Sequence, residues 1–253
     1  MLDDVTAIRA GFAAQPCLEA RVDEAFRHAV GLGFDGLIYD FTPAAPGQRG
    51  RVRDPALLAL RNVDEGMRDL WFEGSYFQID PVQRVAVTTT VPFCWSYDDT
   101  IESAITPHLT EETRPVCQFL REHEVYSGVT IPIHLPGGDF ATVTGVGLGR
   151  RVLWEHGEGD RIAALSLLAQ LFHQSAAEFL APPPGQAEAV PHLTPRETEC
   201  LLLTAEGLSA KEISRALERA EATVVMHINA AMRKLGARNR VHAVTLATRL
   251  GII

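Results

Sequence analysis

The sequence has no apolar run close to the roughly 20 residues that a membrane-spanning helix needs. Its first residues, which include Asp3 and Asp4, do not show the basic and then apolar pattern of a secretory signal peptide. We therefore expect no membrane partner, and we expect the protein to act in the cytoplasm.

Cysteine is scarce, and no two of the four cysteines form a Cys-x-x-Cys pair. Each lies in apolar or helical sequence, which indicates small buried side chains and not disulfides or metal ligands. The four are Cys17, Cys94, Cys117 and Cys200. We expect no metal and no cofactor.

The chain also lacks a glycine-rich phosphate loop and any His/Cys spacing typical of a metal centre. Its tight acidic groups fall at residues 98–99, 111–112 and 122–124. These segments read as turns or helix surfaces, where solvation is expected and a shifted catalytic pKa is not. The sequence therefore predicts a protein that is not an enzyme.

Charge is divided unevenly along a chain whose net charge is −9. Residues 190–253 contain nine Lys and Arg against six Asp and Glu, whereas the rest contains 14 against 26. A basic segment on an acidic body fits one module that meets phosphates and one that does not. We place one domain at 1–180, a semi-rigid Pro-rich linker at 181–190 and a second, basic domain at 191–253.

Two helix-start signals lie close together in the last part of the chain. Thr194 and Ser209 are each followed three residues later by Glu, which is the pattern of a capping box. Gly207 lies between them, where a helix end favours a residue that tolerates positive φ. A third helical pattern, ended by glycine, carries an apolar stripe at Val224, Ile228, Ala231 and Leu235. This spacing predicts a helix-turn-helix, although an αα-hairpin that packs without binding DNA has the same spacing.

The residues of this segment resemble the LuxR-type DNA-binding domain. The matching runs are 193–197 (LTPRE), 207–213 (GLSAKEI), 222–224 (ATV), 227–229 (HIN) and 234–240 (KLGARNR), with Leu201, Ala243 and Val244. The resemblance implies a four-helix, all-α domain that binds double-stranded DNA with a two-fold symmetric operator as a homodimer.

If the apolar stripe faces the core, a separate face of the third helix is free to read the major groove. We expect Val225, Met226 and Asn229 to meet base edges, since Asn suits adenine and Val or Met can cover a thymine methyl. We expect phosphate contacts from Ser209, Lys211, Thr223, His227, Arg233 and Lys234. Glu197, Leu201 and Gly207 are better explained as cap, core and helix stop.

The pattern of residues 1–180, the body of the chain, predicts an α+β domain, an α/β/α sandwich with a central antiparallel sheet. Helices are expected within 2–33, with a break near Pro16, and again at 110–124 and 160–180. Strands are expected at 34–41 and 91–97 and in a hairpin of 129–133 with 140–148. Residues 42–54 read as a loop with solvated arginines at 49, 51 and 53, and residues 55–79 read as helical.

This body resembles the signal-binding domain of LuxR-type quorum-sensing regulators. The residues that carry the resemblance are Asp80-Pro81, Trp95 and the run 127–134 (SGVTIPIH). It implies an acyl-homoserine lactone site in which an Asp accepts from the ligand amide and a Trp and a Tyr donate to its carbonyls. Aligned without gaps, Asp80 is that Asp, Trp95 is the aromatic wall and Thr144 supplies a further polar contact.

The resemblance breaks down at the donors. The family's Trp falls on Met67, its Tyr on Trp71 and a second Tyr on Val63. Met has no N–H, and a buried carbonyl without its donor costs roughly 1–3 kcal/mol, or about tenfold to over a hundredfold in affinity. A register in which Trp71 is the family's Trp would need a gap of four residues before Asp80. The signal can thus be an acyl-homoserine lactone, an aryl or other non-lactone compound, or absent.

Each expected ligand contact has a purely structural alternative. The expected contacts are Met67, Trp71, Tyr76, Asp80, Trp95, Thr130 and Thr144. Asp80 can cap a helix that begins at Pro81, the aromatic residues and Met67 can be core, and the two threonines can be cross-strand partners. We expect His134, at the strand end, to be solvated.

The sequence therefore predicts a transcriptional regulator of quorum sensing that is gated by a small hydrophobic signal. Two alternatives stay open. One is a ligand-independent regulator with a solid core in place of a pocket, and the other is a module that heterodimerises with another regulator and blocks it.

Overall fold

The computed structural model describes residues 5–43, 57–135, 138–149, 158–180 and 191–253. The chain divides into two compact units, the first made of residues 1–135 and 139–181 and the second of residues 136–138 and 182–253. The arginines at 49, 51 and 53 and the linker expected at 181–190 lie outside the described residues. The linker and the exact domain boundaries therefore stay predictions.

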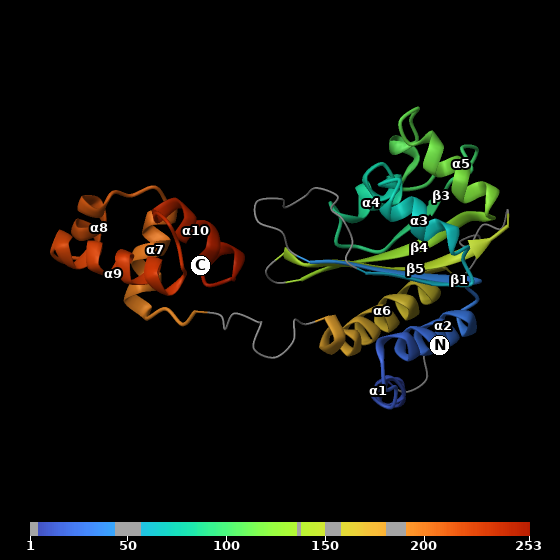
Figure 1. Ribbon diagram of the computed structural model, residues 1–253, viewed down its shortest axis with the longest axis horizontal. Helices are drawn as coiled ribbons and strands as arrows, with labels where there is room; N and C mark the ends of the chain where they lie inside the picture. The colour runs from blue at the N-terminus through green and yellow to red at the C-terminus, as the bar shows by residue number, and fades with distance from the viewer. Residues whose placement is uncertain (1–4, 44–56, 136–137, 150–157, 181–190) are drawn as a thin grey trace. The chain divides into compact units, whose positions relative to one another are not determined.

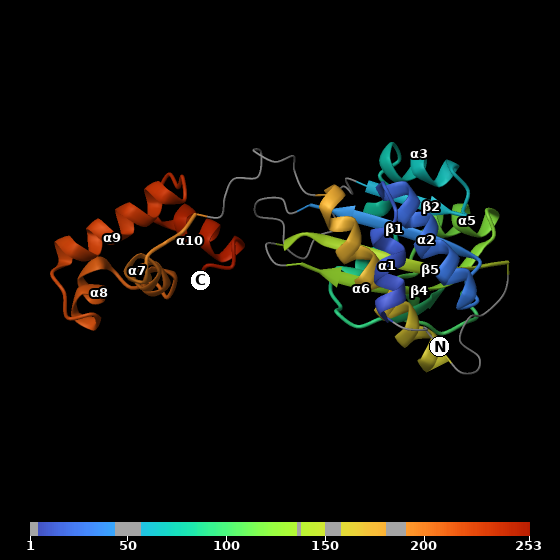
Figure 2. The same ribbon diagram turned by 90° about the horizontal axis from the view of Figure 1, so that it is seen from below.

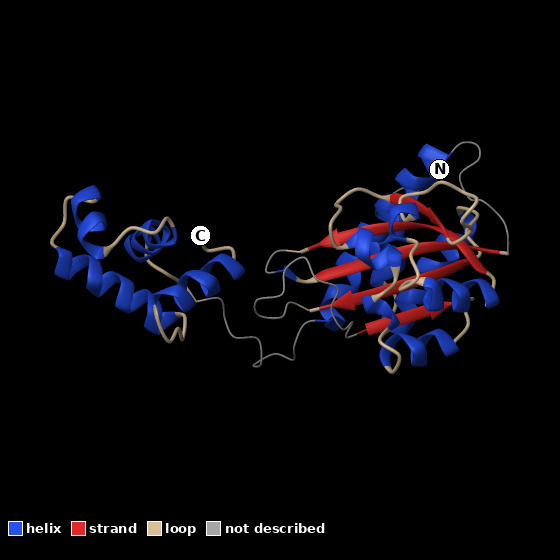
Figure 3. Cartoon of the chain, turned by 90° about the horizontal axis from the view of Figure 1, so that it is seen from above, coloured by secondary structure: helices blue, strands red, loops and turns tan. Residues whose placement is uncertain are grey.

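The first unit is a five-stranded antiparallel sheet between two layers of helices, which confirms the predicted α+β sandwich (Figures 1 and 3). The strand order is β2-β1-β5-β4-β3, with β1 Gly36–Thr42, β2 Leu57–Arg61, β3 Phe93–Ser96, β4 Val125–His134 and β5 Phe140–Leu148. One face carries α1 Val5–Ala13, α2 Leu18–Gly31 and α6 Glu158–Leu180 (Figure 2). The other carries α3 Gly66–Phe72, η1 Tyr76–Gln78, α4 Pro81–Ala86, η2 Thr106–His108 and α5 Arg114–Glu122.

The predicted hairpin of β4 and β5 forms the centre of the sheet. Nearly every residue of both strands is buried, because helices cover both faces. Side chains alternate along β4, so Val129, Ile131 and Ile133 join the core beneath α2 and α6. Thr130 therefore faces the opposite layer, where a second core gathers around Trp71, Trp95 and Tyr97.

Residues 57–61 are β2, so the prediction of helix over the whole of 55–79 is wrong at its start. The run LLALR has good helix propensity. Its Leu58 and Leu60 nevertheless reach 1% and 2% exposure by pairing with β1, where Tyr39 lies opposite Ala59. Burial against a neighbouring strand decides the structure here, and local propensity does not.

The cysteines divide between core and surface. Cys117 and Cys200 are buried and Cys94 is half-buried, as expected. Cys17 is exposed, which corrects the expectation of a buried thiol, because it occupies the N-cap position just before α2. Within the described ranges, no three His, Cys, Asp or Glu side chains are placed to hold a metal ion.

The second unit consists of α7 Pro195–Ala205, α8 Ala210–Ala216, α9 Glu221–Lys234 and α10 Arg240–Arg249 (Figure 2). Both predicted capping boxes are present, at Thr194 with Glu197 and at Ser209 with Glu212. Gly207 has the positive φ, 90°, that was expected between the first two helices. The predicted stripe of α9 is buried, at 8% exposure or less: Val224, Ile228, Ala231 and Leu235.

In the part of the chain that the structure describes, no helix combines the length and the apolar character that crossing a membrane requires.

Candidate functional site

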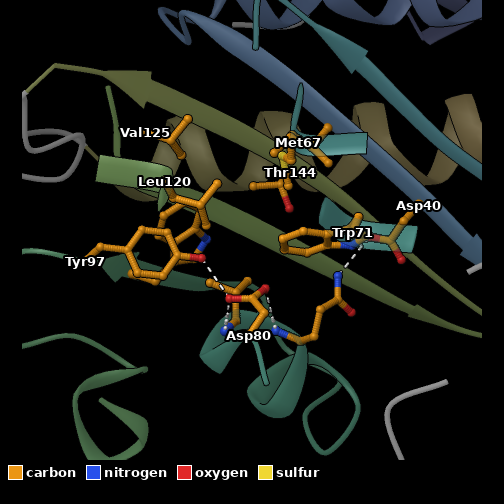
Figure 4. Close-up of a pocket in the computed structure, with 12 residues that line it drawn as sticks. Asp40, Met67, Trp71, Asp80, Tyr97, Leu120, Val125 and Thr144 are labelled. Carbon is orange, nitrogen blue, oxygen red and sulfur yellow. Dashed lines mark hydrogen bonds between the residues drawn. The ribbon is translucent and has the colours of Figure 1, made fainter. Parts of the chain in front are cut away.

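A small enclosed cavity lies between the sheet and the layer of α3, α4 and α5 (Figure 4). Its volume of about 20 Å³ is close to what one water molecule needs. It is lined by Ile38, Asp40, Met67, Trp71, Asp80, Val82, Gln83, Trp95, Tyr97, Leu120, Val125 and Thr144. Five of the seven expected ligand contacts are thus brought together around one space.

Asp80 is buried at the wall of this cavity and also caps α4. Its Oδ1 accepts from the backbone N–H of Val82 at 3.1 Å, and its Oδ2 accepts from that of Gln83 at 3.3 Å. The fixed φ of Pro81 suits the first position of that helix. Burial raises the pKa of Asp80 to about 6, against the lowering effect of these hydrogen bonds. Capping leaves the carboxylate in place on the cavity wall, so the structural and the ligand-binding interpretations are compatible.

Tyr97 lines the cavity and was missed at the sequence level. Its hydroxyl donates to Asp80 Oδ1 at 2.8 Å, and burial raises its pKa well above the ordinary value. It lies two residues after Trp95, at the end of β3, and the two ring centroids are 4.9 Å apart. The two-residue period of a strand was the signal that could have placed Tyr97 beside Trp95 on one face.

Asp40 is a second buried carboxyl on the same cavity, and it too was missed. It lies in β1 and is 2% exposed. Its Oδ2 accepts from Gln83 Nε2 at 3.0 Å and from the hydroxyl of Thr142. Burial raises its pKa to about 6. An ionisable residue within the apolar run LIYDF was the available signal.

A series of side-chain hydrogen bonds that crosses the sheet holds Trp95 in place. Its Nε1 donates to Thr130 Oγ1 at 2.8 Å, and Thr130 Oγ1 lies 2.9 Å from Thr144 Oγ1. The two threonines face each other directly in the register of β4 and β5. Gly128 makes room for the indole, since a Cβ there would lie 2.4 Å from Trp95 Cζ2. Thr130 is therefore a cross-strand partner behind the cavity wall, whereas Thr144 also lines the cavity.

The two residues that replace the family's donors both face the cavity from α3. Met67 and Trp71 are each 3% exposed. Among the described residues, no acceptor is hydrogen-bonded to the indole N–H of Trp71, which leaves it able to donate elsewhere. Tyr76 is not on the cavity wall, and its half-buried ring packs edge-on against Phe119 with 6.4 Å between centroids.

His134, at the end of β4, is exposed, as expected. Its Nε2 lies 2.8 Å from the carbonyl oxygen of Thr89 and 3.2 Å from that of Ala86. It fastens the turn after α4 to the sheet and does not line the cavity.

On α9, four of the expected DNA contacts share one face. Asn229 lies four residues after Val225, three after Met226 and four before Arg233, which are spacings of neighbours on a helix surface. Met226 is 54% exposed, an unusual position for a large apolar side chain that has no neighbour to cover it. Asn229 and Arg233 are also exposed, whereas Val225 is half-buried against the core of α8 and α9.

The expected phosphate contacts have different surroundings. Lys211 is exposed, and Thr223 and His227 are half-buried. The Ser209 hydroxyl takes part in the capping box of α8. Lys234 Nζ lies 2.7 Å from Glu197 Oε2 and donates to the carbonyl oxygen of His192 at 3.3 Å. It therefore joins the end of α9 to the start of α7.

Glu197 is the buried partner in that ion pair. Burial would raise the pKa of its carboxyl, but hydrogen bonds from Lys234 and Thr194 hold the pKa below its usual range. The carboxylate also receives the backbone N–H of Thr194 at 2.7 Å. This supports the expected role of Glu197 as a fold determinant.

Two family models match the chain. The model described as "Autoinducer binding domain" matches residues 18–176, and the model "Bacterial regulatory proteins, luxR family" matches residues 191–247. The chain belongs to the LuxR family of bacterial regulators. It is a DNA-binding transcriptional regulator of the quorum-sensing type, with an autoinducer-binding domain followed by a helix-turn-helix domain.

Named relatives of this LuxR-family regulator are transcriptional regulators too. The transcriptional activator protein BjaR1 of Bradyrhizobium diazoefficiens is 32% identical over 88% of this chain and 84% of that protein. The quorum sensing-dependent transcriptional regulator RpaR of Rhodopseudomonas palustris is 33% identical over 73% of this chain and 70% of its own length.

Solved structures share the fold. A crystal structure of Escherichia coli SdiA has a TM-score of 0.65 and 22% identity, and covers 99% of each chain. SdiA in complex with octanoyl-rac-glycerol has a TM-score of 0.66 and 20% identity, and covers 100% of this chain and 98% of that one.

Proposed function

We propose that residues 1–180 bind a small signal molecule in the cavity beside Asp80, and that its binding controls the attachment of residues 191–253 to DNA. The observation that carries this proposal is the buried Asp80 carboxylate, which is held on the cavity wall by Tyr97 and by two backbone donors. A carboxylate fixed in this way is prepared to accept a hydrogen bond from a ligand N–H without further ordering.

The donors around the cavity favour a signal other than an acyl-homoserine lactone held in the family's usual way. Met67 cannot donate a hydrogen bond, and the indole of Trp95 already donates to Thr130. Trp71 supplies an available N–H from α3. A ligand with one acceptor near Trp71 and one donor near Asp80 fits these groups, whereas a second buried carbonyl would be left without a partner.

Binding of such a signal requires the cavity to enlarge. Ligand pockets usually occupy roughly 300–1,000 Å³, far more than the 20 Å³ between the side chains here. Met67 is unbranched and adapts its shape easily. Two residues that flank α3 have positive φ: the exposed Asn62, at 51°, and the half-buried Ser75, at 54°. We infer that a shift of α3 and its side chains admits the ligand.

A ligand that binds the folded unit and not the unfolded chain stabilises it, by about 2.7 kcal/mol at one hundred times its Kd. We propose that this stabilisation favours a homodimer. The dimer presents two copies of α9, about 34 Å apart, to a two-fold symmetric operator. The face of Val225, Met226 and Asn229 is the proposed reader of base edges. The proposed site of action is the cytoplasm, where a regulator of this family meets its DNA.

The test is the melting temperature of the full chain with and without lipophilic extract of its source cells. We expect the extract to raise it for the wild type and for Glu111→Gln, an exposed control, but not for Asp80→Asn. Equal stabilisation of the Asp80→Asn variant would remove Asp80 from the ligand site.

The small cavity also supports a second candidate, a ligand-independent regulator with a packed core. The ligand-gated and the ligand-independent candidates are distinguished with protein that has been unfolded, freed of small molecules and refolded. Full operator affinity without extract supports the second candidate, whereas recovery of affinity after extract is added supports the first. A protein that shifts no DNA by itself but blocks another regulator would support the heterodimer alternative.

A further inference from the structure

Asp40 gives the cavity a second carboxylate that faces the ligand space. Both hydrogen bonds of its side chain, from Gln83 and from Thr142, go to Oδ2. No donor among the described residues reaches Oδ1, although the side chain is 98% buried. Oδ1 therefore retains its full capacity to accept a hydrogen bond from a molecule in the cavity.

Gln83 fixes the spacing between the two carboxylates. Its side-chain amide donates to Asp40 at 3.0 Å while its backbone N–H donates to Asp80 at 3.3 Å. Gln83 therefore links the two acids, both of which are labelled at the cavity in Figure 4. A ligand that lies along the cavity wall meets two acceptors.

No positive group compensates these acids. The lining residues include no Lys, Arg or His, and neither carboxylate forms an ion pair with any described residue. Buried charges in proteins are ordinarily paired, because an isolated charge is costly to remove from water. The site lacks one positive charge that a ligand could bring.

Aromatic rings complete the same wall. Trp71, Trp95 and Tyr97 all line the cavity with the two acids. Aromatic faces attract cations, and sets of aromatic rings with a carboxylate are suited to ammonium groups. Burial raises the pKa of both acids to about 6, against the lowering effect of their hydrogen bonds.

We propose that Asp40 is a specificity-determining residue of the signal site, and that the cavity selects a small organic molecule that carries an ammonium group. The ammonium donates to Asp40 Oδ1, while Asp80 accepts from a second donor of the same molecule. This inference rests on the proposed function and names the chemical class of its ligand. A plain acyl chain would instead leave Asp40 Oδ1 buried without a hydrogen-bond donor.

The test measures binding of two matched probes to the full chain at pH 7.5 by isothermal calorimetry. Butylammonium and 1-butanol have the same length, and both donate hydrogen bonds, but only the first carries charge. We expect saturable butylammonium binding, at least about tenfold tighter than that of 1-butanol. The Asp40→Asn variant should lose this preference and bind both probes alike.

Asp69→Asn is the matched control, since it removes one exposed carboxylate of α3 and so changes the net charge by the same amount. We expect it to keep the wild-type preference, which excludes general attraction of cations to an acidic protein. Absence of saturable butylammonium binding to the wild type would overturn the proposal. An unchanged preference in Asp40→Asn would also overturn it.

Failure of this inference and failure of the proposed function give different results. If source-cell extract stabilises the wild type but not Asp80→Asn, while butylammonium binds no better than 1-butanol, the signal site stands and the ammonium assignment falls. If extract stabilises neither protein, the signal site itself falls.

Discussion

The indole N–H of Trp95 donates to the hydroxyl oxygen of Thr130 at 2.8 Å, across the boundary between β3 and β4. The same oxygen lies 2.9 Å from the hydroxyl oxygen of Thr144 on β5. This series of hydrogen bonds holds Trp95 at the wall of the cavity. Because the Trp95 N–H already has an acceptor, the indole contacts a ligand through its ring.

The variant Thr130→Val tests this series of hydrogen bonds. The valine keeps the shape of the buried side chain but leaves the Trp95 N–H without an acceptor, which costs about 1–3 kcal/mol. All three tryptophans lie in the first 180 residues, so their fluorescence during urea unfolding reports that unit. Thr90→Val, at an exposed position, is the control. If the unfolding free energy of Thr130→Val equals that of the wild type, this series of hydrogen bonds does not stabilise the fold.

Asp40 predicts a dependence of stability on pH. Its pKa is about 6 in the folded protein and about 3.9 in an unfolded chain, so the folded state binds the proton more tightly. Its contribution to stability is therefore full below pH 4 and falls as the pH rises to about 6, by roughly 2–3 kcal/mol. It stays constant above that pH.

Asp40→Asn removes this dependence. Subtracting the wild-type unfolding free energy from that of the variant at each pH isolates Asp40 from other titrating groups. We expect this difference to increase in favour of the variant between pH 4.5 and 7.5. A difference that does not change with pH would mean that Asp40 is not a carboxyl with a raised pKa.

Asn229→Ala tests the reading face of α9. The side chain is exposed, so the fold should be unaffected, whereas loss of a bidentate contact to one base costs about 1–3 kcal/mol of discrimination. Operator titration against sites with single-base changes measures this. Thr245→Ala, on the surface of α10, should retain full specificity. Unchanged specificity of Asn229→Ala would place base recognition on another face.

Lys234→Met separates two roles of one lysine. The ion pair with Glu197 predicts that the variant loosens the start of α7, because a buried carboxylate loses its partner. Hydrogen exchange of the amides of α7 should become faster. A phosphate contact predicts in addition that the slope of log affinity against log salt falls by about one. An unchanged rate of hydrogen exchange in α7 together with a reduced salt slope would mean that Lys234 contacts DNA and does not stabilise α7.

The second unit could be predicted in detail because its signals are local. Capping boxes, a helix-ending glycine and an apolar stripe each depend on residues three or four positions apart, and all are present in the structure. The hairpin of β4 and β5 was also predicted from local alternation. The DNA contacts themselves stay predictions.

The cavity could be predicted only in part, because it depends on contacts between distant segments. Asp40 and Gln83 meet across 43 positions of sequence, and Thr142 reaches Asp40 across 102. Alignment from Asp80 pointed to Met67 and Trp71, which both line the cavity, whereas Tyr76, another expected ligand contact, does not line it. The turn around Ser75, with its positive φ, directs the short helix of Tyr76 toward Phe119 instead.

Native mass spectrometry of the full chain, purified from the cells that produce it, tests most directly whether the cavity beside Asp80 holds a signal. We predict a mass above that of the polypeptide for the wild type and for the Glu111→Gln control, and the bare polypeptide mass for Asp80→Asn. A wild-type protein that binds its operator fully at the bare polypeptide mass would contradict the account.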